Sequence, residues 1–312
     1  MTMTVVKPGL QSTLQSRPRT GLRHQGVPAG GAADPLSLAL ANRLVGNAWD
    51  ATALEVTLAG PVLRFERDCA YAFAGAAVPV ARNGIAVEPH ETLFARAGDE
   101  LVIGPTTAGA RLYLAVAGGF DADDVLGSSS TNLQAAFGGF GGRALQAGDA
   151  LQYAAGAAEA VTTPAEFRPP MAASRALRVC ESAETPLLDG AGREALFGAN
   201  WVVDRRADRM GLRLDGPPLS VASEGRMPSA GVLPGTIQCP GDAPYLLGVD
   251  AGTVGGYPRV AQVTRADRHL TGQLRPGDRV RLLHREPEEA VAELRAKVDY
   301  WSAWLPDAAE IF

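Results

Sequence analysis

The sequence predicts a mostly β protein built from two related halves. Glycine and proline are frequent, with 36 and 22 residues among 312, so long helices can occupy only a small part of the chain. Its apolar runs are short and end at Gly, Pro, Asp or Asn, which is typical of strands in a barrel or sandwich. An internal repeat indicates that the halves derive from one ancestral unit. We therefore expect two β-barrel halves with few short helices.

Short apolar runs rich in β-branched and aromatic residues predict the strands. They cover residues 62–65, 70–73, 101–103, 112–116, 177–180, 201–203, 245–249, 259–263 and 280–283. Their spacing along the chain, with turn residues between them, matches that of barrel and sandwich domains.

Two segments predict helices. Residues 35–45 begin after Asp34, a good N-cap, and end before Gly46, a typical C-terminal stop. After Pro287, apolar residues recur at spacings of three and four as far as Trp301, which indicates an amphipathic C-terminal helix. A weaker third helix is expected at residues 193–197.

The internal repeat consists of three shared patterns in the same order. They are R-x-G-L-R-x-x-G-x-P at 19–28 and 209–218, Gly-Gly-aromatic at 118–120 and 255–257, and Gly-Asp at 148–149 and 277–278. Six fixed positions in a ten-residue pattern predict that the halves are copies of one unit.

These patterns predict four segments. They are an N-terminal barrel half at 1–161 with a helical insertion near 35–45, a proline-rich linker at 162–174, a C-terminal barrel half at 175–285, and a C-terminal helix and tail at 286–312. Pro164, Pro169 and Pro170 without hydrophobic periodicity are the basis for the linker.

Charge and hydropathy argue against nucleic acid and membranes as partners. The net charge is −5, and Lys7 and Lys297 are the only lysines, so no basic face is expected. No apolar run reaches the roughly 18 residues of a membrane span, and the N-terminus lacks a secretory signal. We expect a cytoplasmic protein whose three cysteines are reduced core thiols.

Several cofactor motifs are missing. There is no G-x-x-x-x-G-K-[ST] loop, so any ATP is expected to be held with or by a partner subunit. No Met-Lys-Met element exists for covalent biotin, and the four scattered histidines predict no metal site. Residues 190–195 fit G-x-G-x-x-A, but they do not follow a strand directly, so we do not assign a dinucleotide site.

Two arginines of the second half are candidate anion ligands. If residues 209–213 are extended, Arg209 and Arg213 face the same way, and two guanidinium forks suit a carboxylate, carbamate or phosphate. The alternative is structural, with an arginine paired to a buried acid that ties its strand to the barrel. The sequence leaves both interpretations open.

Polar residues within glycine-rich loops form the second candidate group. They are Ser229, Gln238, Asp250, Thr253 and Tyr257, beside Gly255 and Gly256. Glycines let the backbone approach a ligand, and these side chains suit an amide or urea-like group. The alternative is a set of tight turns, with Ser229 an ordinary loop serine. In the first half, Ser128–Asn132 could hold an anion, although a solvated turn is favoured.

These same residues resemble a known family. The motifs are Pro8–Thr13, Gly26–Pro28 with Gly30–Ala32, Ala41–Asn47, Asp208–Leu214, Gly235–Pro240 and Gly255–Pro258. Together they resemble the KipA family over residues 8 to 285. This family is also described as the C-type subunit of 5-oxoprolinase, as allophanate hydrolase subunit 2-like, or as biotin-dependent carboxyltransferase-like proteins. The chain departs from the family pattern at Ala33 and at Gly252–Val254.

The resemblance implies two cyclophilin-like β-barrels and a subunit of an ATP-dependent 5-oxoprolinase. That enzyme opens 5-oxo-L-proline to L-glutamate with two further subunits, one KipI-like and one LamB/YcsF-like. We expect Asp250, Tyr257 and Gln238 to orient or act on the amide. Arg209 and Arg213 would hold an anionic group, with Ser229, Thr253, Gly255 and Gly256 also contacting the substrate.

The resemblance also carries two alternatives. One is the carboxyltransferase subunit of a biotin-dependent urea or amide carboxylase. The other is a non-enzymatic regulator that binds a KipI-like kinase inhibitor.

Overall fold

The computed structural model describes residues 1–172, 174–222 and 227–312. The chain divides into two compact units. Unit 1 comprises Met1–Arg19, Gly30–Met171 and Trp301–Ile311, and unit 2 comprises Thr20–Ala29, Ala172–Tyr300 and Phe312. The long stretches of the two units meet at residues 171 and 172, inside the segment predicted as a linker, in which residue 173 lies outside the described residues.

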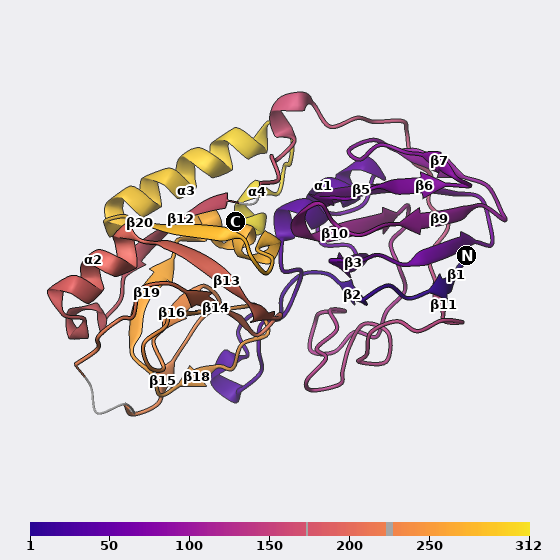
Figure 1. Cartoon of the computed structure of the whole chain (residues 1–312). Helices are drawn as coiled ribbons and strands as arrows, with labels where there is room; N and C mark the ends of the chain where they lie inside the picture. The colour runs from indigo at the N-terminus through magenta and orange to yellow at the C-terminus, as the bar shows by residue number, and fades with distance from the viewer. Residues whose placement is uncertain (173, 223–226) are drawn as a thin grey trace. The chain divides into compact units, whose positions relative to one another are not determined.

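Unit 1 consists mainly of two antiparallel sheets (Figure 1). Its strands are β1 (Thr2–Lys7), β2 (Gln11–Gln15), β3 (Ala53–Thr57), β4 (Val62–Phe65), β5 (Cys69–Ala77), β6 (Val80–Arg82), β7 (Ile85–Ala86), β8 (Leu93–Ala95), β9 (Glu100–Ile103), β10 (Ala108–Val116) and β11 (Ala150–Gln152). Within the described residues, one sheet has the order β11-β1-β4-β9-β6-β7 and the other β2-β3-β10-β5-β8. Apolar side chains from both sheets share one core cluster, so the two sheets enclose a common interior.

Unit 2 contains a closed barrel. Its strands are β12 (Ser174–Glu181), β13 (Asn200–Ala207), β14 (Gly211–Asp215), β15 (Ala230–Gly231), β16 (Thr236–Gln238), β17 (Tyr245–Leu247), β18 (Val254–Gly255), β19 (Arg259–Val263) and β20 (Arg279–His284). The barrel order is β12-β19-β16-β17-β14-β13-β20, closed by a parallel β12–β20 pairing, and β15 and β18 form a separate ribbon. Its core gathers apolar side chains from the barrel strands.

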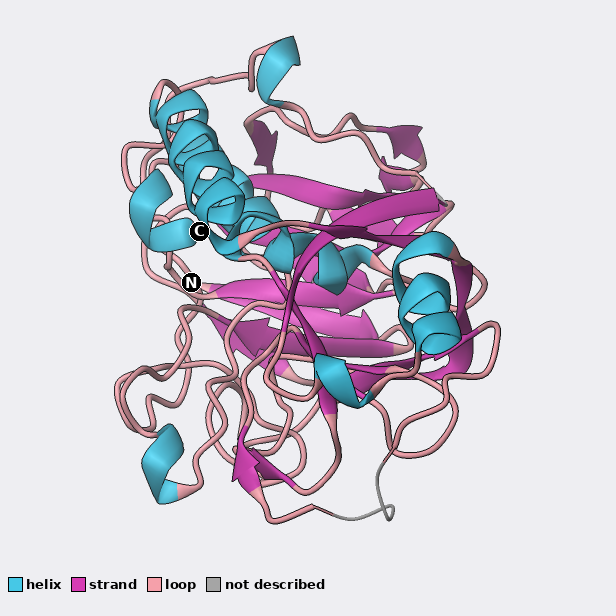
Figure 2. Cartoon of the chain, turned by 90° about the vertical axis from the view of Figure 1, so that its left-hand side faces the viewer, coloured by secondary structure: helices cyan, strands magenta, loops and turns pink. Residues whose placement is uncertain are grey.

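The mostly β fold class is confirmed, and strands and loops make up most of the chain (Figure 2). Each predicted strand overlaps an observed one, and the closed barrel lies in the half where the sequence placed one. Unit 1 differs from a single closed barrel, because its strands divide into two sheets.

The predicted helices are present. Helix α1 (Pro35–Leu44) has Asp34 as its N-cap, whose carboxylate accepts a hydrogen bond from Ser37 N, and Gly46 follows it at φ 73°. Helix α2 spans Gly190–Gly198, so the G-x-G-x-x-A pattern lies on a helix. The remaining short elements are η1 (Arg23–Gln25), η2 (Ala165–Phe167), η3 (Thr185–Leu187), η4 (Arg265–Gln273) and α4 (Ala308–Ile311).

Helix α3 (Pro287–Ser302) confirms the predicted C-terminal helix, but it buries little of its apolar stripe. Val291 is 48% exposed, and Trp301 is the buried end of the stripe. Polar contacts within unit 2 hold the helix instead. Glu293 accepts a hydrogen bond from Arg285 Nε at 2.8 Å, and Lys297 Nζ donates to the Ala266 carbonyl at 2.7 Å.

The shared decamer is not a structural repeat. In residues 19–28 it forms the short helix η1, with Gly21 at φ 77°, whereas in residues 209–218 it leads into strand β14, where Gly211 is extended. The Gly-Gly pairs also differ, since Gly118 and Gly119 have positive φ and Gly255 lies in strand β18. Identical letters therefore adopt different local structures, because tertiary packing decides the conformation.

The Gly-Asp pairs, by contrast, form one recurring turn. At Gly148 and Gly277 the φ angle is 90° and 88°, and the following Asp carboxylate accepts a hydrogen bond from the backbone N–H three residues earlier. Each turn also exchanges two backbone bonds with a neighbouring strand, β1 at Val5 and β13 at Val203. Gly98 forms the same turn a third time at φ 91°. The device marks strand entries rather than the two halves.

Candidate functional site

The ribbon of unit 2 brings together several predicted ligand residues. Strands β15 and β18 pair Ala230 with Gly255, and beyond them Met227 N donates to the Gly256 carbonyl at 2.9 Å. An added Cβ at Gly256 would lie 3.6 Å from Ser229 Oγ. Val232 N donates to the carbonyl of Thr253 at 3.1 Å, so the two glycine-rich loops form one surface.

Gln238 connects this ribbon to the barrel. It lies at the end of β16, is 6% exposed, and donates from Nε2 to the Tyr257 carbonyl at 3.2 Å. A Cβ at Gly255 would stand 2.4 Å from Gln238 Nε2, so only glycine leaves room for this amide. The Tyr257 side chain is 40% exposed and can reach a ligand. The predicted association of Gln238, Gly255 and Tyr257 is therefore present in the structure.

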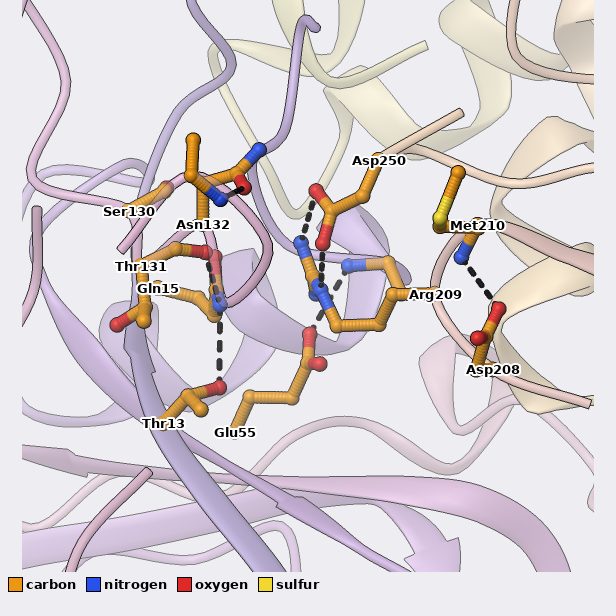
Figure 3. Close-up of polar contacts among 12 residues, drawn as sticks. Thr13, Gln15, Glu55, Ser130, Thr131, Asn132, Asp208, Arg209, Met210 and Asp250 are labelled. Atoms are coloured by element: carbon orange, nitrogen blue, oxygen red, sulfur yellow. Dashed lines mark hydrogen bonds and ion pairs between the residues drawn. The ribbon is translucent and has the colours of Figure 1, made fainter. Parts of the chain in front are cut away.

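Arg209 and Asp250 form a buried ion pair in unit 2 (Figure 3). Arg209 donates from Nε to Asp250 Oδ2 at 2.7 Å and from Nη2 to Oδ1 at 3.0 Å, and the side chains are 4% and 5% exposed. Asp250 N also donates to the Arg209 carbonyl at 3.0 Å. Both oxygens of Asp250 are occupied, which favours the structural alternative for this pair over direct contact with substrate.

Arg213 does not share an anion with Arg209, because each guanidinium binds a different carboxylate. Arg213 lies within β14 and donates from Nε to Asp215 Oδ1 at 2.9 Å. This pair is far more exposed, with side chains 31% and 46% accessible. The hydrogen bond to Asp215 raises the pKa of Arg213.

Sequence reasoning did not select Arg23 as a site residue, although it belongs to the decamer. Its Nη2 donates to the carbonyls of Val232 at 2.6 Å and Gly252 at 3.0 Å, so it joins both ribbon loops from segment 20–29 of unit 2. Burial lowers the pKa of Arg23. The spacing shared with Arg213 was the available signal, but it pointed to the wrong guanidinium for this loop.

Arg259 supports the other side of the ribbon. It forms a bidentate pair with Glu184, with Nε to Oε2 at 2.7 Å and Nη2 to Oε1 at 2.5 Å, and donates from Nη1 to the Gly231 carbonyl at 3.2 Å. The hydrogen bond from Arg259 lowers the pKa of Glu184. No sequence pattern marked Glu184, because it belongs to a distant turn that only the fold brings to β19.

Unit 1 buries a carboxylate that the sequence reasoning also missed. Glu55 on β3 is fully buried beside its cross-strand neighbour Tyr113 on β10, whose hydroxyl donates to Oε2 at 2.6 Å. The hydroxyl accepts a hydrogen bond from Asp34 N at 2.8 Å, so the network reaches the start of α1. Burial, followed by the charge of Glu55, raises the pKa of Tyr113 well above its ordinary value. A lone Glu in an apolar strand was the available signal.

The serine loop of unit 1 is a correction to both interpretations of the sequence. Ser128, Ser130 and Thr131 are 1%, 0% and 0% exposed, so the loop is not a solvated turn, and its polar groups bond protein atoms. Arg19 donates to the carbonyls of residues 125, 128 and 130. Gln15 Nε2 donates to the Thr131 carbonyl at 3.2 Å (Figure 3). The loop covers the edge strand β2, whose exposed backbone would otherwise be open to pairing.

The ribbon surface can therefore bind and orient a small polar group. Its hydroxyls, side-chain amide and backbone groups supply donors and acceptors for an amide. No cluster of three or more His, Cys, Asp or Glu in the described part of the chain could hold a metal ion. Among the described helices, none is long and apolar enough to span a membrane.

Comparison with known proteins agrees with this architecture. Residues 25–284 match the model of the carboxyltransferase domain, subdomain A and B. The chain belongs to this carboxyltransferase domain family. One relative is the C-type subunit of the 5-oxoprolinase of Escherichia coli, 33% identical over 97% of this chain and 98% of its own length.

Urea-processing members of the family are much longer. The urea amidolyase of Lachancea kluyveri is 32% identical over 89% of this chain, which spans only 17% of that protein. The crystal structure of the Kluyveromyces lactis urea carboxylase matches with a TM-score of 0.90 and 30% identity, covering 96% of this chain and 29% of the other. In the carboxyltransferase family, this domain therefore occurs both as a separate chain and as part of larger proteins.

Proposed function

We propose that the chain is the C-type subunit of an ATP-dependent 5-oxoprolinase, which hydrolyses 5-oxo-L-proline to L-glutamate. The observation that carries the proposal is the match over nearly the whole length of both chains to the corresponding protein of Escherichia coli. A second C-type subunit, from Haemophilus influenzae, supports it at 33% identity over 92% of each chain. A KipI-like protein and a LamB/YcsF-like protein complete the complex, and ATP is held with or by one of these partners.

In this function the ribbon surface of unit 2 contacts the lactam. Gln238 and Tyr257 orient the amide, and Ser229, Thr253 and the glycines of β18 contact it. The buried ion pair of Arg209 and Asp250 positions the loop that leads to this surface. This assignment is supported by the occupied Asp250 oxygens and by the fixed Gln238 amide.

Reconstitution tests the proposal. The KipI-like and LamB/YcsF-like partners from the same genome are assayed for 5-oxoproline-dependent ATP hydrolysis and for glutamate, with and without this chain. We expect turnover only in the complete mixture. Equal turnover without the chain would remove the proposal.

A single glycine tests the proposed surface. Gly255→Ala places a Cβ 2.4 Å from Gln238 Nε2, so the amide must move and lose its bond to Tyr257. We expect a raised KM for 5-oxoproline and little loss of stability, because the displaced group is the end of a side chain. Gly198→Ala, at the end of α2 with open space around the new Cβ, is the control. Unchanged kinetics for Gly255→Ala would exclude this surface.

A second candidate function is a carboxyltransferase component of a biotin-dependent urea or amide carboxylase. The TM-score of 0.90 to a urea carboxylase favours it. This function requires a biotinylated carrier supplied by another chain, and its activity would be abolished by avidin. Avidin-insensitive turnover in the reconstituted mixture would exclude it.

A further inference from the structure

A small cavity in unit 1 lies where the C-terminal segment packs beside α1. Its volume is about 110 Å³, and it is half-enclosed. Arg43 at the end of α1 and Trp49 in the following loop line one part, while Leu305, Asp307 and Ile311 line another. Helices α1 and α4 are in contact, so the cavity is formed within one compact unit.

The apolar part of the cavity is rigidly held. Leu305 and Ile311 are 2% and 5% exposed, so they belong to the interior and only their inner surface borders the cavity. The indole of Trp49 is fixed because its Nε1 donates to Glu310 Oε2 at 3.2 Å. These side chains give a preformed apolar wall, which lowers the entropic cost of binding a ligand.

The charged part of the cavity has two groups of opposite sign. Neither Arg43 nor Asp307 has an ion-pair partner among the described residues. Arg43 stacks its guanidinium over the Trp304 ring, 5.3 Å from the ring centre. Stacking engages the face of the guanidinium and leaves its N–H edge for an acceptor. One cavity thus presents an available cation and an available anion beside an apolar wall.

We propose that this cavity binds a small zwitterion, namely a free α-amino acid with a short apolar side chain. Its carboxylate would accept hydrogen bonds from Arg43, its ammonium would donate to Asp307, and its side chain would contact Leu305 and Ile311. The size supports a short side chain, since a cavity of about 150 Å³ is known to hold benzene and this one is smaller. The site shares no residue with the ribbon surface of unit 2, so it does not depend on the proposed function.

Three related probes test both charges on the full-length chain. L-valine carries both charges, N-acetyl-L-valine lacks the ammonium and L-valinamide lacks the carboxylate. We expect L-valine to bind with a Kd on the order of 1 mM, and each blocked probe to bind at least about tenfold more weakly. Calorimetry gives the affinities, and the indole N–H signal of Trp49, assigned with Trp49→Phe, reports binding at the cavity.

Two substitutions assign each charge to its residue. Arg43→Gln should weaken L-valine and N-acetyl-L-valine but not weaken L-valinamide further, whereas Asp307→Asn should weaken L-valine and L-valinamide but not N-acetyl-L-valine. Arg295→Gln and Asp299→Asn, at exposed positions of α3, are matched controls and should change nothing. Thermal melting verifies that each variant is folded.

The series on the unaltered chain is decisive even if a variant fails to fold. Absence of L-valine binding at concentrations well above the expected Kd would overturn the proposal. Equal affinity for the three probes would do the same, because neither charge would then be recognised. Binding that leaves the Trp49 signal unchanged would show that any amino-acid site lies elsewhere.

Discussion

Removing Arg209 should destabilise the protein strongly, because Asp250 would remain buried without its guanidinium partner. Both side chains are no more than 5% exposed, and two hydrogen bonds of 2.7 and 3.0 Å join them. Breaking one partner of a buried pair costs about 3–5 kcal/mol. At roughly 2–4 °C per kcal/mol for a unit of this size, Arg209→Met should lower the melting temperature by about 10 °C.

Denaturant unfolding monitored by circular dichroism measures this effect. Arg213→Met is the matched control, since its pair with Asp215 is largely exposed, and it should change the free energy of unfolding by no more than about 0.5 kcal/mol. Adding Asp250→Asn to Arg209→Met should restore part of the loss, because the uncompensated charge is gone. If Arg209→Met loses less than about 1 kcal/mol while reconstituted activity disappears, the pair acts on the substrate and the structural argument fails.

Burial lowers the pKa of His90 to about 4, below its ordinary value of 6.5, so the unfolded chain binds more protons between those values and stability falls as pH falls. The loss should reach about 3 kcal/mol near pH 4, and His90→Asn, which tolerates the φ of 66°, should flatten that part of the unfolding profile; an unchanged profile would contradict it. Gly277→Ala, at φ 88° with no steric conflict, should cost about 1–2 kcal/mol, whereas Gly190→Ala in α2 should be neutral or stabilising, and equal melting temperatures would refute the strain argument. Tyr113→Phe should cost about 1–3 kcal/mol by removing a donor from buried Glu55, and melting unchanged from the unaltered chain would show that the network adds nothing.

Local signals in the sequence were sufficient for most elements of the fold. Strand β4 and strand β19 have the predicted bounds, because apolar runs bounded by turn residues determine them locally. Helix α1 was predicted to within one residue at its end, since its cap and its terminating glycine are both local signals. Only the arrangement of strands into two sheets in unit 1 required tertiary information, because several antiparallel pairings are compatible with the same runs.

The candidate site was predicted in part. Gln238, Gly255 and Ser229 lie near the ribbon as expected, because glycine-rich turns and polar residues are visible in the sequence. The partners that hold the ribbon come from distant segments, Arg23 from the first half and Glu184 from an intervening turn. Such pairings depend on the fold and leave no mark at any fixed spacing, so no local pattern could have revealed them.

The decamer shows why shared letters alone are weak evidence for shared structure. Arg19 and Arg209 occupy the same place in the pattern, yet Arg19 donates to three backbone carbonyls of a loop, and Arg209 binds a carboxylate. Both side chains are buried, at 1% and 5% exposed, so the common requirement is a desolvated guanidinium with a full set of acceptors. Carbonyl oxygens or a carboxylate meet that requirement equally well. An arginine in a repeated motif therefore predicts a buried anchor more reliably than it predicts a ligand for an anion.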